Sequence, residues 1–163
     1  MTALLPLLTL AAAIGSGLMA GLFFTFSTFA MTALSRLPPE QGIAAMNSIN
    51  AAILNATFGI AFFGTAVLCL GLGVTGALRW SEPGSAWLLL GSLLYLAGVI
   101  GVTIIFNVPL NNALAAISPA SPEGAALWTR YLGEWVPWNH VRTLTNIGAL
   151  LAFIVAYGRL SAA

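Results

Sequence analysis

The stretch AWLLLGSLLYLAGVIGVTIIF, residues 86–106, contains no charged side chain. It is long enough to cross a bilayer as a helix, which takes about 20 residues. Three more apolar runs of comparable character cover approximately residues 3–34, 50–78 and 141–157. None of these runs shows the alternation of apolar and polar residues that is typical of a barrel strand. A helix, in contrast, pairs its own backbone N–H and C=O groups and is therefore stable within lipid. The sequence therefore predicts an all-α, integral membrane, antiparallel four-helix bundle forming a single domain over residues 1–163.

Composition supports a membrane protein. Of the 163 residues, 60% are hydrophobic and only 6% are charged, whereas soluble domains carry about 25% charged residues. A net charge of +1 gives no reason to expect a nucleic-acid partner. The single cysteine, Cys69, excludes an internal disulfide. We expect the lipid bilayer as the environment and leave open whether the chain forms a homo-oligomer.

The first apolar run has no basic segment before it and is too long for a signal peptide, so we interpret it as a retained span. Four spans place both termini on one side. Basic residues are almost equally divided, with Arg79 and Arg159 on the side of the termini and Arg36 and Arg130 on the other. We favour a bacterial inner-membrane protein with both termini in the cytoplasm.

Polar side chains gather at one end of the predicted bundle. Antiparallel threading brings the end of spans one and three to the same side as the start of spans two and four. The polar residues at that end are Thr25, Ser27, Thr28, Thr32, Asn47, Asn50, Asn55, Thr57, Thr103, Asn107, Asn111, Asn139, His140, Arg142, Thr143 and Asn146. The opposite end has few polar side chains, which predicts an asymmetric bundle with one polar end.

Arg142 is the most informative residue of this set. Together with Asn139, Thr143 and Asn146 it falls on one helical face. A cation inside a span is costly and usually faces a partner or a water-filled cavity, which favours a functional role. Snorkelling of its side chain to the nearby interface is the alternative. The asparagines have an alternative as well, because amides often join membrane helices to one another.

His140 is the single histidine and the side chain best suited to move a proton near neutral pH. An ordinary interfacial histidine is the alternative. One histidine and no cysteine cluster argue against a zinc, di-metal or bis-histidine haem site, so no cofactor is predicted. For Trp128, Trp135 and Trp138 we favour an interfacial aromatic belt over ligand stacking.

Local motifs add three structural expectations. In SPEGAALWTRYLGEW, residues 121–135, a serine followed by proline predicts the start of a short amphipathic helix lying at the interface over the bundle mouth. Arg130 and Glu134 are spaced to pair on its other face. Gly17 and Gly21 predict a close helix contact on span one, and Pro109 predicts a kink near Asn107.

Three motifs resemble the anthrone oxygenase-like family of small four-span membrane proteins: MNSIN at residues 46–50 followed by Asn55 and Phe58, NVPLNN at residues 107–112, and WNHVRT at residues 138–143. Ala56 departs from the proline expected after Asn55. The resemblance implies oxidation of an anthrone, a flat and lipophilic aromatic ketone, to an anthraquinone with dioxygen as co-substrate and no tightly held cofactor or metal.

The resemblance also implies roles for residues at the polar end. His140 would be the base, and Arg142, Asn107, Asn111 and Asn139 would hold the oxyanion and peroxide oxygens. The residues expected to bind the substrate are Asn50, Asn55, Asn146, Trp138, Trp135, Phe106 and Thr25.

A different class of function fits the same residues. A non-catalytic membrane module could bind a quinone, a lipid or a partner subunit through the polar end. Catalysis requires a cavity at His140 large enough for a tricyclic ring system, whereas a purely structural network requires asparagines bonded to one another without a void. The geometry of the polar end separates the two hypotheses.

Overall fold

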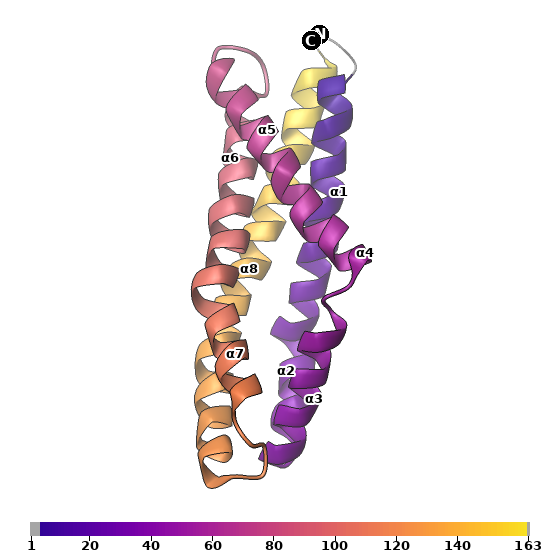
Figure 1. Cartoon of the computed structure of the whole chain (residues 1–163). Helices are drawn as coiled ribbons and strands as arrows, with labels where there is room; N and C mark the ends of the chain where they lie inside the picture. Colours follow the sequence, from indigo (N-terminus) through magenta and orange to yellow (C-terminus); the bar gives the residue numbers. More distant parts are fainter. Residues whose placement is uncertain (1–3, 163) are drawn as a thin grey trace.

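The computed structural model describes residues 4–162 and is an elongated bundle of four helical arms (Figure 1). Three arms contain π-helical segments, labelled η. The elements in chain order are α1 (Leu4–Thr25), η1 (Phe26–Ala30), α2 (Met31–Ser35), α3 (Pro39–Ala52), α4 (Ala56–Gly59), η2 (Ile60–Gly64), α5 (Thr65–Leu78), α6 (Ser85–Tyr95), η3 (Leu96–Gly101), η4 (Thr103–Asn107), α7 (Val108–Ala116) and α8 (Pro122–Ser161). The α5–α6 turn lies at the same end as the termini, and the α2–α3 and α7–α8 connections lie at the other end.

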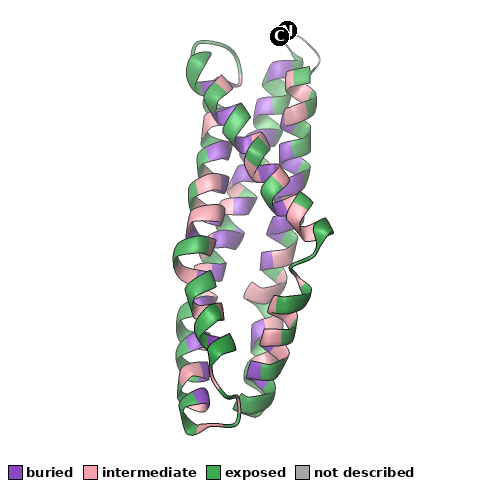
Figure 2. Cartoon of the chain, viewed as in Figure 1, coloured by how far each residue is buried: buried purple, intermediate pink, exposed green. Residues whose placement is uncertain are grey.

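Four helices in the described residues are long and apolar enough to cross a membrane: Leu4–Ser35, Ala56–Leu78, Ser85–Ala116 and Pro122–Ser161. The prediction of an all-helical bundle with four long apolar helices is therefore confirmed. The predicted start of span one at residue 3 lies outside the described residues. Buried residues line the inner faces of the arms and exposed residues the outer faces (Figure 2). The cytoplasmic placement of the termini stays a prediction.

The predicted short helix over the bundle mouth is not a separate element. Ser121 caps a helix as expected, because its Oγ accepts a hydrogen bond from the Gly124 amide at 3.0 Å. That helix, however, is α8, which continues for 40 residues to Ser161 with Pro137 inside it. At about 1.5 Å per residue it is about 60 Å long, twice the thickness of the hydrocarbon core.

One continuous buried stripe explains why α8 does not break. Residues 128, 131, 135, 139, 142, 146, 149 and 153 are all buried and recur at intervals of three and four. The tryptophans expected at the interface, Trp128 and Trp135, belong to this stripe and pack against Ile43, Met46 and Leu114 of α3 and α7. Arg130 and Glu134 pair on the outer face, with Nε and Oε1 2.8 Å apart, as predicted.

The second arm is broken between α3 and α4. The predicted second span, 50–78, crosses this break. Asn55 satisfies both sides of it: Oδ1 accepts from the Phe58 amide at 3.0 Å, and Nδ2 donates to the Ala52 carbonyl at 2.9 Å. Ala56 follows as the first helical residue, so the break forms without a proline at this position. Asn55 is exposed, and its side-chain amide forms hydrogen bonds to backbone groups.

The glycines that permit close helix contacts differ from those predicted. A Cβ on Gly21 would meet nothing within 4 Å, and one on Gly17 would be 3.7 Å from Leu150. The tight contacts lie elsewhere, because the inward stripe of α1 runs through Gly15, which faces Thr65. On α6, a Cβ on Gly91 would be 2.9 Å from the ring of Phe153.

We therefore expect Gly91→Ala to destabilise the bundle by about 1–3 kcal/mol, because the fully buried Phe153 ring has no room to move. Gly71→Ala is the matched control, since its Cβ would meet nothing within 4 Å. Thermal unfolding of both variants in the same detergent checks this. Equal midpoints for the two variants would contradict the packing argument.

Candidate functional site

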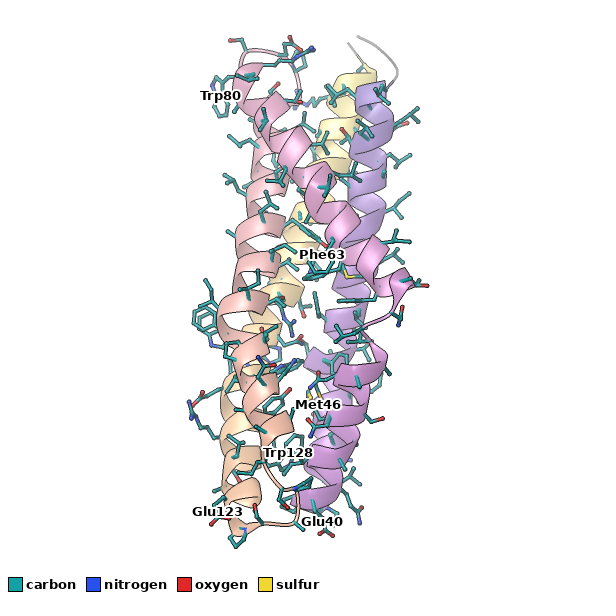
Figure 3. The ribbon with its side chains drawn as sticks, viewed as in Figure 1. Glu40, Met46, Phe63, Trp80, Glu123 and Trp128 are labelled. Carbon is teal, nitrogen blue, oxygen red and sulfur yellow. The ribbon has the colours of Figure 1, made fainter. Side chains whose placement is uncertain are left out.

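A cavity of about 440 Å³ lies in the half of the bundle that holds the α2–α3 and α7–α8 connections. Its size is typical of small-molecule sites, which span about 300–1,000 Å³. All four arms contribute to its wall: Phe23, Phe26, Met46, Asn47, Ile49, Asn50, Ala51, Ile53, Leu54, Phe58, Thr103, Val108, Asn111, Asn112, Ala115, Trp135 and Arg142. Met46 and Trp128, labelled in Figure 3, are buried inside this half. The wall is largely apolar with a few polar groups, as is typical of small-molecule sites.

Arg142 is the charged group of this wall and is only 5% exposed. Its guanidinium carbon lies 4.2 Å from the centre of the Phe23 ring and 4.9 Å from the centre of the Trp135 ring. Cation–π contacts of this kind stabilise a desolvated cation by about 2 kcal/mol. Nη2 donates to Asn139 Oδ1 at 2.9 Å, and Nη1 donates to Thr103 Oγ1 at 3.4 Å.

No carboxylate lies within 4.0 Å of Arg142 in residues 4–162, where the ion pairs are Arg79–Glu82 and Arg130–Glu134. Nε of Arg142 has no hydrogen-bond partner either. A buried cation without a counter-charge is costly. Its contact with an open cavity suits a ligand that carries negative charge on oxygen.

Three predicted asparagines hold the frame around Arg142 and are absent from the cavity wall. Asn139 Nδ2 donates to the Phe23 carbonyl and to Ser27 Oγ, both at 2.8 Å, which leaves Oδ1 to accept from Arg142. Asn146 donates to the Arg142 carbonyl at 3.0 Å, and Asn107 donates to the Trp135 carbonyl at 3.2 Å. These contacts are the interhelical and intrahelical bonds of a structural network.

Asn50 and Asn111 do line the cavity. Asn111 Nδ2 donates to Asn50 Oδ1 at 3.3 Å, and the Tyr131 hydroxyl donates to Asn111 Oδ1 at 2.8 Å. Asn50 Nδ2 has no partner, and neither does Trp135 Nε1. Arg142 Nε is a third unpaired donor among the wall residues, and Asn47 Oδ1 is an unpaired acceptor. All four atoms are buried, so these residues contact the cavity through other atoms.

The remaining predicted site residues lie away from the cavity. His140 is exposed on α8 and is not part of the wall. Phe106 and Trp138 stack on each other with ring centres 3.6 Å apart and also lie outside the wall. Thr25 donates its hydroxyl to the Gly21 carbonyl at 3.0 Å. The polar end therefore combines a structural network with a cavity, and Arg142, not His140, lines that cavity.

Sequence reasoning missed several wall residues. Phe23 and Phe26, which come from α1 and η1, and Met46 from α3 were given no role because apolar side chains in a span carry no local signal. Asn47 and Thr103 were recognised as members of the polar end but not as site residues. Among residues 4–162, no three His, Cys, Asp or Glu side chains gather where they could hold a metal ion.

The mouth of the cavity lies between the α3–α4 break and α7. Several wall residues there face the outside, among them Ala51, Leu54, Val108 and Ala115, and Leu54 is 79% exposed. Large exposed hydrophobic side chains are absent from α3 but begin at Leu54 and continue along the second arm. The mouth therefore lies where the apolar exterior of the second arm begins.

The sequence model of the family described as anthrone oxygenase matches residues 54–152. The chain belongs to the anthrone oxygenase family. No curated protein and no solved structure matches the chain. The predicted membership of this family is thereby confirmed. NVPLNN and WNHVRT lie within the matched residues, and MNSIN lies before them.

The match to the anthrone oxygenase family includes nine of the 17 residues of the cavity wall. It begins at Leu54, beside the mouth, and contains Phe58, Asn111, Trp135 and Arg142. The wall residues of α1, η1 and α3 lie before it. The part of the chain that the family model matches thus contains Arg142, and residues of α1, η1 and α3 complete the cavity wall.

The mouth yields a prediction about access. Leu54→Trp places a larger side chain at the rim and should slow association of a flat lipophilic ligand by about tenfold. Ile60→Trp is the matched control, since Ile60 is 74% exposed and not part of the wall. The probe is a hydroxyanthraquinone dissolved in liposomes, with binding followed by its visible absorption. Equal association rates for both variants would place the access route elsewhere.

Proposed function

We propose that this protein is an oxygenase that converts a flat, lipophilic aromatic ketone of the anthrone type to the quinone with dioxygen. The observation that carries the proposal is Arg142, a buried cation without a carboxylate partner in the described residues, set between two aromatic rings in the wall of an apolar cavity. Membership of the anthrone oxygenase family supports the reaction class.

The first chemical step is ionisation. The central ring of an anthrone carries a ketone carbon opposite a methylene carbon, and loss of a methylene proton places negative charge on the ketone oxygen. Arg142 suits an oxygen of this kind, because it is the cation of the cavity wall. Donors that are already in place stabilise developing negative charge strongly in a site that excludes water.

The second step is reaction with dioxygen. The enolate transfers one electron to dioxygen, and the resulting carbon radical and superoxide combine to form a C–O bond. The resulting peroxide takes up a proton on its terminal oxygen. Loss of the second hydrogen of that carbon as a proton then forms the new C=O bond and breaks the O–O bond, which releases hydroxide. One oxygen atom becomes the second quinone carbonyl, and the other leaves as water after protonation. The methylene carbon loses four electrons, and dioxygen gains four.

The route of the first proton follows from the wall. His140, expected as the base, is exposed and is not part of the wall, which among the described residues has no His, Asp, Glu or Cys side chain. We propose that Arg142 favours the enolate and that the proton passes to water at the mouth. Arg142 then has the electrostatic role, and its cation remains protonated throughout.

A lipid environment suits this reaction. The aromatic ketone and dioxygen both partition into lipid, and the mouth opens where the apolar exterior of the second arm begins. The wall rings Phe23, Phe26, Phe58 and Trp135 offer flat apolar surfaces for a fused ring system. Building the site within the bundle brings the two substrates together without transfer through bulk water.

Arg142→Gln should lower kcat for anthrone-dependent dioxygen uptake by about a hundredfold to a thousandfold, the usual effect of removing an oxyanion-stabilising donor. Arg142→Lys should retain part of the activity because it keeps the charge but loses the planar donor set. The measurement uses detergent-purified, chelator-treated protein, corrected for spontaneous oxidation. Arg159→Gln, at the exposed end of α8, is the matched control.

Two further results decide between hypotheses. His140→Ala leaves turnover nearly unchanged if water accepts the proton, and abolishes it if His140 acts as the base. Ligand binding that depends on Arg142, without dioxygen uptake above background in the unmodified protein, would replace the enzyme by a non-catalytic module that binds a quinone or lipid.

A further inference from the structure

We propose that the membrane surface crosses the mouth of the cavity, so that the cavity opens to lipid on one side and to water on the other. The half of the bundle that holds the α2–α3 and α7–α8 connections, residues 30–53 and 109–140, then extends out of the membrane and is called the projecting half. The exterior and the packing of the bundle carry this placement, and only its consequence for the reaction rests on the proposed function.

The exterior of the bundle changes in every arm. The exposed large hydrophobic side chains nearest the projecting half are, in chain order, Phe29, Leu54, Val108 and Leu144. Within residues 30–53 one large hydrophobic side chain is exposed, Leu37 at 38%, and within residues 109–143 there is none. The exposed side chains there include Arg36, Glu40, Ser48, Asn112, Arg130 and Glu134. An apolar exterior thus gives way to a polar one.

Hydrogen bonds between the arms place these changes in one zone of the bundle. The Asn111–Asn50 bond joins α7 to α3, and the Asn139–Ser27 bond joins α8 to η1. A hydrogen bond between η4 and α8 connects the two pairs. The four residues at which the exterior changes lie two to five residues from the first two bonds. Helices tilt in a membrane, which accounts for the offsets between arms.

The charged residues are distributed in the same way. Arg79, Glu82 and Arg159 lie towards the end that holds the termini, and Arg36, Glu40, Glu123, Arg130 and Glu134 lie in the projecting half. Between these two groups only Arg142 carries a charge. The uncharged residues 85–108 form about 36 Å of helix. This length crosses a hydrocarbon core of about 30 Å with some tilt.

The interior changes together with the exterior. The core nearer the termini includes many small residues, among them Gly15, Gly91 and Ala149, which is typical of helices packed within lipid. The projecting half instead buries large side chains beneath its polar exterior: Met46, Leu114, Trp128, Tyr131 and Trp135. Water drives the burial of large apolar side chains. This half therefore has the pattern of a water-soluble protein.

The length of α8 gives the size of the projecting half. Residues 122–140 account for about 27 Å of this helix at about 1.5 Å per residue. The headgroup layer adds only about 5–8 Å on each side of the hydrocarbon core. Most of the projecting half therefore lies in water beyond the headgroups, with Glu40 and Glu123 at its far end (Figure 3).

The cavity wall crosses this boundary. Leu54 and Val108, at the mouth, belong to the apolar exterior, whereas Ala51, Asn112 and Ala115 belong to the projecting half. On α7, Val108, Asn112 and Ala115 recur at intervals of four and three, which places them on one helical face. The mouth therefore meets lipid at one edge and water at the other.

A mouth of this kind suits the proposed reaction. The aromatic ketone and dioxygen enter from lipid past Leu54 and Val108, and the proton released on ionisation passes to water past Asn112. Water at the mouth thus accepts the proton, although the wall has no His, Asp, Glu or Cys side chain among the described residues.

Cysteine labelling in lipid nanodiscs tests the placement without any ligand. The unmodified protein is the blank, because its Cys69 is fully buried. Asn112→Cys and Gly133→Cys, at exposed positions of the projecting half, should react rapidly with a sulfonated maleimide. Leu93→Cys and Val67→Cys are the matched controls, since these side chains are 55% and 67% exposed on the apolar exterior. They should react about a hundredfold more slowly, because the reactive thiolate is a charge within the membrane.

Three results would overturn the placement. Slow labelling of Gly133→Cys would put the projecting half within the membrane, and slow labelling of Asn112→Cys would put the whole mouth there. Equal rates at all four positions would remove the boundary. Gly133→Cys is compatible with the fold, because a Cβ at this position meets nothing within 4 Å.

A second measurement tests whether a ligand reaches the aqueous edge of the mouth. A bound hydroxyanthraquinone, followed by its visible absorption, should slow labelling of Asn112→Cys in proportion to the fraction of protein that carries it. Ala113→Cys is the matched control, since Ala113 is exposed beside Asn112 but is not part of the wall. Bound ligand that protects neither cysteine, or both equally, would overturn the two-sided mouth. Failure of the ligand to bind would count against the proposed function alone, because labelling without ligand places the boundary independently.

Discussion

The contact of the Arg142 guanidinium with the Phe23 and Trp135 rings is the interaction on which the polar half of the bundle depends. It joins α1 to α8, and the bond to Thr103 adds the third arm. A cation in an apolar interior is stable only when its surroundings compensate for lost water. Here aromatic faces and the neutral oxygens of Thr103 and Asn139 compensate in part.

The asparagines around this cation have two distinct duties. Asn107, Asn139 and Asn146 use their NH₂ groups on backbone carbonyls and fix the helices. Asn50 and Asn111 bond to each other at the cavity. Both duties come from the same side chain because an amide carries a donor and an acceptor at once. Structural and ligand-binding interpretations of such residues are therefore compatible within one bundle.

The break between α3 and α4 links the fold to access. Irregular backbone near a lipid-facing surface requires that its polar groups be satisfied, and non-helical backbone at membrane depth is tolerated where it lines a cavity. The Asn55 side chain satisfies backbone groups by hydrogen bonding on both sides of the break. Ile53 and Leu54, at the break, line the cavity. The family match begins at this point of the chain.

The sequence by itself determined the four apolar helices, their antiparallel order and the polar end, because hydrophobic length and helical periodicity are local properties. It also indicated Arg142, since a cation in a span is conspicuous anywhere. Only the tertiary structure decided which polar residues face the cavity: His140 and Arg142 are two positions apart, yet one is exposed and the other buried. A rotation of about 100° per residue separates them, and the packing of α8 against the other arms decides which face turns inward.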